Sequence, residues 1–108
     1  MGDPPPLTLK TTAEFRAWYK SLGEVDQTKI DAWLDNMRVG VFRASKSLKR
    51  GLLELKWKNG MRVYYSRKRI AGANLIILWG GSKGTQSKDI RKARQIKRRY
   101  EDAFEEEG

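Results

Sequence analysis

Residues 51–67 read GLLELKWKNGMRVYYSR, and this stretch decides the fold because it encodes a β-hairpin. Apolar and polar residues alternate from 53 to 58 and again from Met61 to Arg67, which is the pattern of strands with one buried and one solvated face. Asn59 and Gly60, between the two runs, are the residue types that a tight hairpin turn prefers.

The chain after the hairpin predicts a third strand and a helix. Residues 67–72 make a second turn, and the uninterrupted apolar run within Ala73–Trp79 is typical of a strand that is covered on both faces. These strands form a three-stranded antiparallel meander. A loop, Gly80–Gln86, leads to a closing helix from about Ser87 to Phe104, whose apolar residues recur at helical spacing.

The chain before the hairpin predicts a strand and two helices. Leu7–Lys10 alternates as a short strand does. A first helix follows a capping box of Thr11 and Glu14 and ends at Gly23, and a second runs from about Asp26 to Arg38. Large apolar residues recur at helical spacing in both helices, so these faces are more probable as core than as binding surfaces.

The remaining segments are a loop at Arg43–Arg50 and a Pro-rich, flexible leader at residues 1–6. The order of elements predicts a single α+β domain over residues 1–108, in which one sheet face packs on the helical hairpin. The opposite face is expected to be exposed. It carries these side chains: Glu54, Lys56, Lys58, Arg62 and Tyr64.

The composition limits the chemistry. There is no Cys and no His, and the basic stretch from Arg38 to Arg99 is nearly free of carboxylates. A zinc site held by the protein is therefore close to excluded, and a tight magnesium site is disfavoured. We therefore expect no metal and no small-molecule cofactor. No apolar run approaches the roughly 20 residues of a membrane span, and the start lacks an export signal, which predicts a cytoplasmic protein without a membrane partner.

Charge is distributed very unevenly. Between Arg38 and Arg99 lie 19 of the 23 Lys and Arg residues but just two acids, which makes this stretch formally +17. Such a surface favours a polyanion, because cations that neutralise phosphates release condensed counterions. The alternative is a surface charged for solubility, but solubility does not require the two signs to be separated.

Strand alternation places Glu54, Lys56 and Lys58 on one face, and the tight turn returns Arg62 and Tyr64 beside them. A carboxylate among cations suits either a surface ion pair or general acid–base chemistry, and spacing alone weights the two about equally.

The glycine-rich segment Trp79–Gln86 offers backbone amides near a helix start, where Gly81 and Ser82 would bind phosphate. A tight connector is the simpler interpretation of this segment taken alone. It does not match the spacing of a Walker A loop. The anionic-ligand surface is predicted to extend over further cations: Lys46, Lys49, Arg50, Lys83, Lys88 and Arg91.

Two segments carry a family resemblance. GLLELKWKNGMRVYY at 51–65 and LWGGSKGTQSKDIRKA at 78–93 resemble the addiction-module killer proteins, which are toxins of the RelE/ParE/HigB superfamily in bacterial type II toxin–antitoxin systems. The resemblance extends from about Leu7 to Tyr100. It implies the RelE/ParE-like fold, and the G-G-(S/D)-K-x-T-Q-x-x-D-I segment is its most specific part.

The resemblance also implies a function. Such toxins are metal-free endoribonucleases that cut translated mRNA on the ribosome, and a small helix-turn-helix antitoxin holds them silent. A base takes a proton from a ribose 2′-hydroxyl, which attacks the adjacent phosphate, and cations stabilise the added charge. The family's phosphate stabiliser maps onto Arg62, its base onto Glu54 or Lys56, and its loop cation onto Lys83.

This chain lacks the histidine that some members use as the acid, so the leaving-group proton would come from Lys83, Tyr64 or Tyr65. Two other functions stay open. A sister branch of the superfamily inhibits DNA gyrase without enzymatic activity, so fold kinship does not identify the target. A basic adaptor that docks on ribosomal RNA is the third.

Overall fold

The structure, a computed structural model, describes residues 8–67 and 72–105. Its elements follow the order β-α-α-β-β-β-β-α. They are β1 (Leu9–Thr11), α1 (Ala13–Lys20), α2 (Glu24–Arg38), β2 (Lys46–Ser47), β3 (Leu53–Lys56), β4 (Arg62–Ser66), β5 (Leu75–Gly81) and α3 (Gln86–Glu105).

The strands form one five-stranded sheet in the order β1-β5-β4-β3-β2. The predicted meander, β3 to β5, is its antiparallel centre. Glu54 pairs with Tyr64 because three residues, 58–60, connect Trp57 with Met61, one more than the tight turn predicted at Asn59 and Gly60. β1 joins the sheet in parallel beside β5, with Leu9 opposite Leu75. The predicted α+β class is confirmed, and the sheet is wider than the meander.

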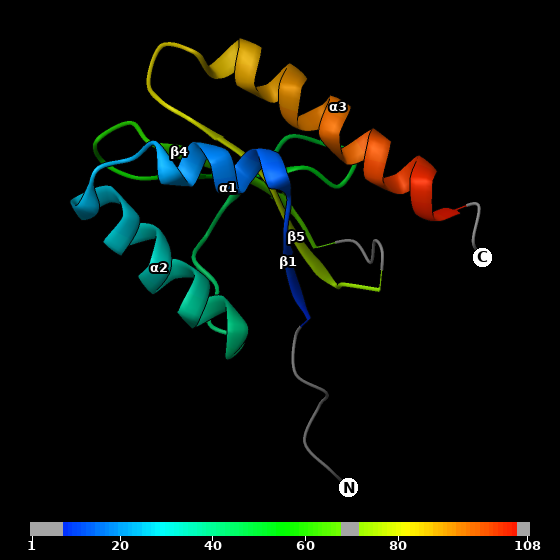
Figure 1. Ribbon diagram of the computed structural model, residues 1–108, viewed down its shortest axis with the longest axis horizontal. Coiled ribbons are helices and arrows are strands. Elements are labelled where there is room, and N and C mark those ends of the chain that lie inside the picture. The colour runs from blue at the N-terminus through cyan, green and yellow to red at the C-terminus, as the bar shows by residue number, and fades with distance from the viewer. Residues whose placement is uncertain (1–7, 68–71, 106–108) are drawn as a thin grey trace, which may run out of the picture.

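Helices cover both faces of this sheet. α1 and α2 lie on one side and α3 on the other (Figure 1). The larger core packs the helical hairpin on the sheet and includes Phe15, Ile30 and Trp33, so the core assignment of the two apolar helix faces is confirmed. The smaller core packs α3 on Leu52, Tyr64, Ile76 and Leu78. β5 is buried on both faces, as its apolar run predicts.

The expectation of an exposed outer sheet face is wrong. α3 crosses that face and buries Glu54, Arg62 and Tyr64, while Lys56 and Lys58 stay exposed. The physical reason is that this face carries its own apolar residues, which a helix with an apolar stripe removes from water.

Several predicted boundaries also change. The expected loop Arg43–Arg50 contains β2, an edge strand that pairs with β3. The cap of α1 is Thr12 rather than Thr11, and Gly23 caps the start of α2 instead of ending α1. β5 continues to Gly81, so the loop before α3 is shorter than predicted. The leader 1–6, Leu7 and turn residues 68–71 lie outside the described residues.

None of the helices within the described residues combines the length and the apolar character needed to cross a bilayer.

Thr12 joins α1 to the sheet, and its removal tests this junction. Its hydroxyl accepts from the Phe15 amide at 2.9 Å and donates to the Leu78 carbonyl at 2.7 Å, in a fully buried position. We expect Thr12→Val to lower the free energy of unfolding by about 2–3 kcal/mol, since both the cap and a buried hydrogen bond disappear. Urea unfolding measures the loss.

Thr28→Val is the matched control for this substitution. The Thr28 side chain is exposed and donates within α2 to the Glu24 carbonyl, so a change of no more than about 0.5 kcal/mol is expected. Equal losses in the two variants would contradict the role given to Thr12.

Candidate functional site

Glu54 lies on β3 beneath the first residue of α3. Its side chain is 5% exposed, and Gln86 Nε2 donates to both carboxylate oxygens, at 3.0 and 3.3 Å. A buried carboxylate is costly unless hydrogen bonds or cations compensate it. Gln86 therefore covers and satisfies the acid. Glu54, Gln86, Arg62 and Tyr64 are called the Glu54 cluster below.

Arg62 begins β4 and is the cation of this cluster. Its Nε lies 3.9 Å from Glu54 Oε1, a distance that suits an ion pair but is too long for a hydrogen bond. Nη1 reaches the Gly60 carbonyl at 3.5 Å, while Nε is buried without a hydrogen-bond partner among the described residues. One donor of the guanidinium is thus left for another acceptor.

Tyr64 stands opposite Glu54 in the sheet and is fully buried. Burial raises the pKa of the Tyr64 hydroxyl, and the negative charge of Glu54 raises it further. Although the carboxylate is close enough to exert this effect, the hydroxyl makes no hydrogen bond of normal geometry within the described part of the chain. Tyr64 therefore stays protonated and keeps a donor available.

A second polar network fixes the start of α3. Asp89 is buried and accepts from Trp79 Nε1 at 3.0 Å and from the Thr85 hydroxyl. Gly81 allows this approach, because a Cβ built there would lie 1.9 Å from Asp89 Oδ2. The strand end and the helix start are thereby locked together, which places Gln86 over Glu54.

Lys83 lies beside the turn of the β3–β4 hairpin. This place agrees with the prediction that the glycine-rich loop and the hairpin bring their cations together. A Cβ built on Gly60 would lie 2.7 Å from the Lys83 Cβ, so the side chain runs along the turn. Lys56 is the register partner of Arg62 and is exposed, as is Lys58. The structure thus brings the four predicted catalytic residues into one region, with two buried and two on the surface.

The predicted phosphate-binding glycine has another role. Gly81 belongs to β5, pairs with Arg62 and is buried against Asp89. Ser82 is exposed in the short loop that follows. Lys88 and Arg91 are exposed on α3. Close packing therefore explains Gly81. This agrees better with a tight connector than with a phosphate-binding loop.

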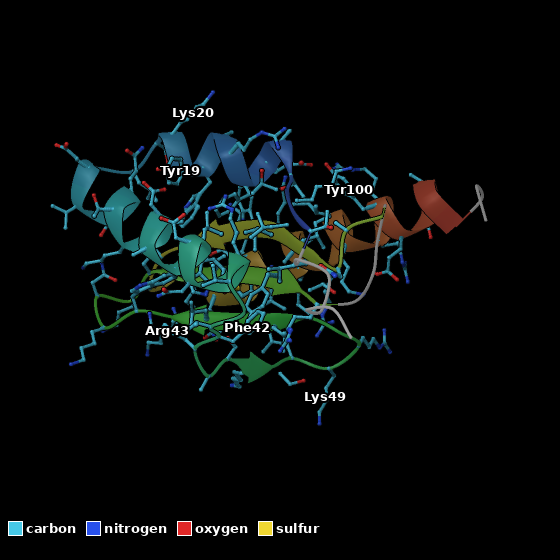
Figure 2. All side chains as sticks on the ribbon, turned by 90° about the horizontal axis from the view of Figure 1, so that it is seen from below. Tyr19, Lys20, Phe42, Arg43, Lys49 and Tyr100 are labelled. Atoms are coloured by element: carbon cyan, nitrogen blue, oxygen red, sulfur yellow. The ribbon has the colours of Figure 1, made fainter. Side chains whose placement is uncertain are left out.

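The other predicted cations lie across the sheet edge. Lys46 is on β2, and Lys49 and Arg50 follow it in a turn where φ is positive at three consecutive residues, 72°, 55° and 79° at Gly51. Left-handed backbone costs a residue with a Cβ about 1–2 kcal/mol. Figure 2 shows Lys49 pointing away from the body of the molecule. This turn is called the Lys49 turn below.

Tyr65 is excluded from the site. It points to the opposite sheet face, where its hydroxyl shares a 2.6 Å hydrogen bond with the Ser45 hydroxyl and its ring meets Trp33 edge-on. Alternation along β4 separates it from Tyr64. Of the two tyrosines considered as proton donors, only Tyr64 lies in the Glu54 cluster.

Two residues at the site were not predicted from the sequence, Gln86 and Asp89. Both lie within the segment 78–93 that carries the family resemblance, at the start of the closing helix. Their polar character at inward positions of an otherwise basic helix was the available signal, because a buried polar residue requires a partner.

Comparison with known proteins gives one informative relative. No protein family model matches the chain, and no solved structure matches it significantly. A protein of Haemophilus influenzae, named there as an uncharacterized protein, is 35% identical over 93 residues, which cover 83% of this chain and 92% of the relative. The chain therefore belongs to the same protein family as this Haemophilus influenzae protein.

Proposed function

We propose that this protein is a metal-free endoribonuclease that acts as the toxin of a type II toxin–antitoxin system. The observation that carries the proposal is the Glu54 cluster, in which Arg62 Nε and the Tyr64 hydroxyl are buried donors beside a carboxylate and have no hydrogen-bond partner among residues 8–67 and 72–105. Each buried donor without a hydrogen bond lowers the stability of the fold by about 1–3 kcal/mol. Binding of an anionic group would explain why the fold keeps these two donors.

The chemistry divides among the cluster and its rim. Glu54 takes the proton of a ribose 2′-hydroxyl, whose oxygen bonds to the adjacent phosphorus as the bond from phosphorus to the 5′-oxygen breaks. Arg62 donates to the phosphate oxygens as their negative charge grows. Lys83, beside the turn, or the protonated Tyr64 supplies the proton to the departing 5′-oxygen. Exposed Lys56 holds a flanking phosphate.

Gln86 controls access in this mechanism. Its amide occupies both Glu54 oxygens, and a ribose hydroxyl has to displace it to reach the carboxylate. A bound mRNA strand, positioned by the ribosome, provides the contacts that compensate this displacement. The partners that follow are mRNA, ribosomal RNA and a helix-turn-helix antitoxin that covers the basic surface.

The experiment that tests the function is the Glu54→Gln variant. The amide keeps the size of the side chain but is no base, so we expect cutting to fall by about 10²–10⁴-fold. Mapping of message 5′ ends after brief induction in growing cells measures it. Glu24→Gln, at an exposed position in the first turn of α2, is the matched control and should cut as the parent does.

The closed state of the cluster favours a second candidate, a non-enzymatic toxin that binds gyrase or another protein. Glu54 and Arg62 are both nearly inaccessible, which a binding toxin tolerates and a nuclease has to open. This candidate predicts DNA damage signalling and no new message 5′ ends. Those two readouts, with growth arrest retained in Glu54→Gln, would overturn the nuclease assignment.

A further inference from the structure

A groove lies between the Lys49 turn and the second half of α3, away from the Glu54 cluster. Its volume is about 580 Å³, within the range of ligand sites. It is lined by Arg50, Gly51, Arg94, Gln95, Lys97, Arg98, Glu101 and Asp102. Four cations and two acids make its wall formally positive.

Side-chain contacts define the shape of this groove. Arg94 donates to the carbonyls of Leu48 and Lys49, which ties the turn to the helix. Lys97 is buried, runs past Gly51 and pairs with Glu101. Lys97 is thus paired with an acid, and Arg94 is bonded to backbone carbonyls. Arg50 and Arg98 are exposed at the rim of the groove.

The backbone at Arg50 points to a function for this rim. Its φ of 55° is a conformation that glycine adopts without strain and an arginine does not. Backbone strain that persists is common where the side chain is needed at that place. Here the strained residue presents a cation at the mouth of a basic groove.

A stripe of exposed residues connects the groove with the Glu54 cluster. Lys88, Arg91, Gln95 and Arg98 follow one another at intervals of three and four residues and are all exposed, so they share one side of α3. Between Gln86 and Arg98 the helix rises by about 18 Å. The stripe thus provides cations along most of the distance from cluster to groove.

We propose that this groove is a second phosphate-binding site, in which Arg50 and Arg98 hold backbone phosphates of the RNA strand whose scissile linkage lies at the Glu54 cluster. The proposal rests on the proposed function for the identity of the strand. The groove binds phosphates through charge, because Arg50 and Arg98 are exposed cations at its rim, and contacts of this kind carry no sequence information.

The test is RNA binding by an Arg50→Gly/Arg98→Ala variant, made together with Glu54→Gln so that the RNA stays intact. Arg50→Gly relaxes the strained turn, so the variant keeps its fold, which thermal unfolding verifies. Anisotropy of a labelled single-stranded RNA is measured over a salt series. We expect about tenfold weaker binding and a salt slope lower by about 1.4, because two phosphate contacts are lost.

Lys20→Ala/Lys29→Ala, with Glu54→Gln, is the matched control. Both lysines are exposed, on α1 and α2, and Figure 2 shows Lys20 on the opposite side of the molecule from Lys49. We expect its affinity to stay within about twofold of the parent, since these lysines are remote from the groove. An unchanged affinity and slope in the groove variant would overturn the proposal.

Two further measurements separate the possible failures. Inorganic phosphate and polyglutamate are used as competitors of the labelled RNA. If the groove variant loses polyglutamate binding but keeps RNA binding, the groove binds an acidic protein and the proposal is wrong. If the wild type binds RNA through the groove and yet produces no message cuts, the proposed function fails while the groove assignment stands.

Discussion

Arg62→Ala is expected to abolish RNA cutting and growth arrest. The guanidinium is the one cation of the Glu54 cluster, and in the proposed mechanism it stabilises the charge that develops on the phosphate. Loss of one such donor typically lowers the rate 10²–10³-fold, and here the whole group is removed. Message 5′-end mapping and colony formation after induction measure the effect.

Arg62→Lys is the informative companion. It keeps the positive charge beside Glu54 but loses the planar set of donors, so an intermediate loss of about tenfold is expected. Because Arg62→Ala leaves a buried carboxylate without its cation, at a cost of about 3–5 kcal/mol, thermal unfolding of each variant has to be measured as well. A folded Arg62→Ala variant that still cuts messages would refute the assignment.

Gly80→Ala and Gly81→Ala are expected to cause large losses of stability. A Cβ at Gly80 would lie 2.2 Å from the Trp18 ring, and one at Gly81 would lie 1.9 Å from the Asp89 carboxylate. Neither neighbour can retreat, since one packs on the main core and the other holds the start of α3. Overpacking of this kind costs about 3 kcal/mol, visible in denaturant unfolding.

Gly23→Ala separates this steric effect from the general effect of replacing glycine. No atom lies within 4 Å of a Cβ built at Gly23, and its φ of −70° suits any residue. A change of at most about 1 kcal/mol is expected there, from the weaker helix cap. Similar losses at positions 23, 80 and 81 would show that close packing does not explain the glycine pair.

The hairpin and the helical pair could be predicted because their signals are local. Asn59 and Gly60 signal the turn, and its three-residue connection, 58–60, sets Glu54 opposite Tyr64. β2 could not be predicted, because Lys46 and Ser47 carry no apolar alternation and pair only through backbone. The parallel place of β1 beside β5 is likewise a long-range pairing that no local pattern encodes.

The sequence does contain a signal that the outer face of the sheet is covered. An apolar run from Leu75 to Leu78 requires cover on both sides, and the helical hairpin supplies just one of them. The closing helix, with its own apolar stripe, was the remaining element. A closing helix on that face buries Glu54 and Arg62 beneath it.

The strand residues of the candidate site could be predicted, but Gln86 and the accessibility of the site could not. Strand alternation places Glu54, Lys56 and Arg62 together whatever covers them. Exposure depends on where α3 lies, and that depends on Trp79, Thr85 and Asp89 meeting across the strand end. The groove needs the backbone conformation at Arg50, which a side-chain pattern does not reveal.

The pairing of β1 with β5 also governs when the molecule matures during its synthesis. Thr12 and Leu78, which share a hydrogen bond, are separated by 66 positions in the chain. The apolar face of α1, which packs against β5, therefore stays partly uncovered in the nascent polypeptide until β5 has been made. Because Gln86 follows β5 in the chain, synthesis has to pass the last strand before the Glu54 cluster can assemble.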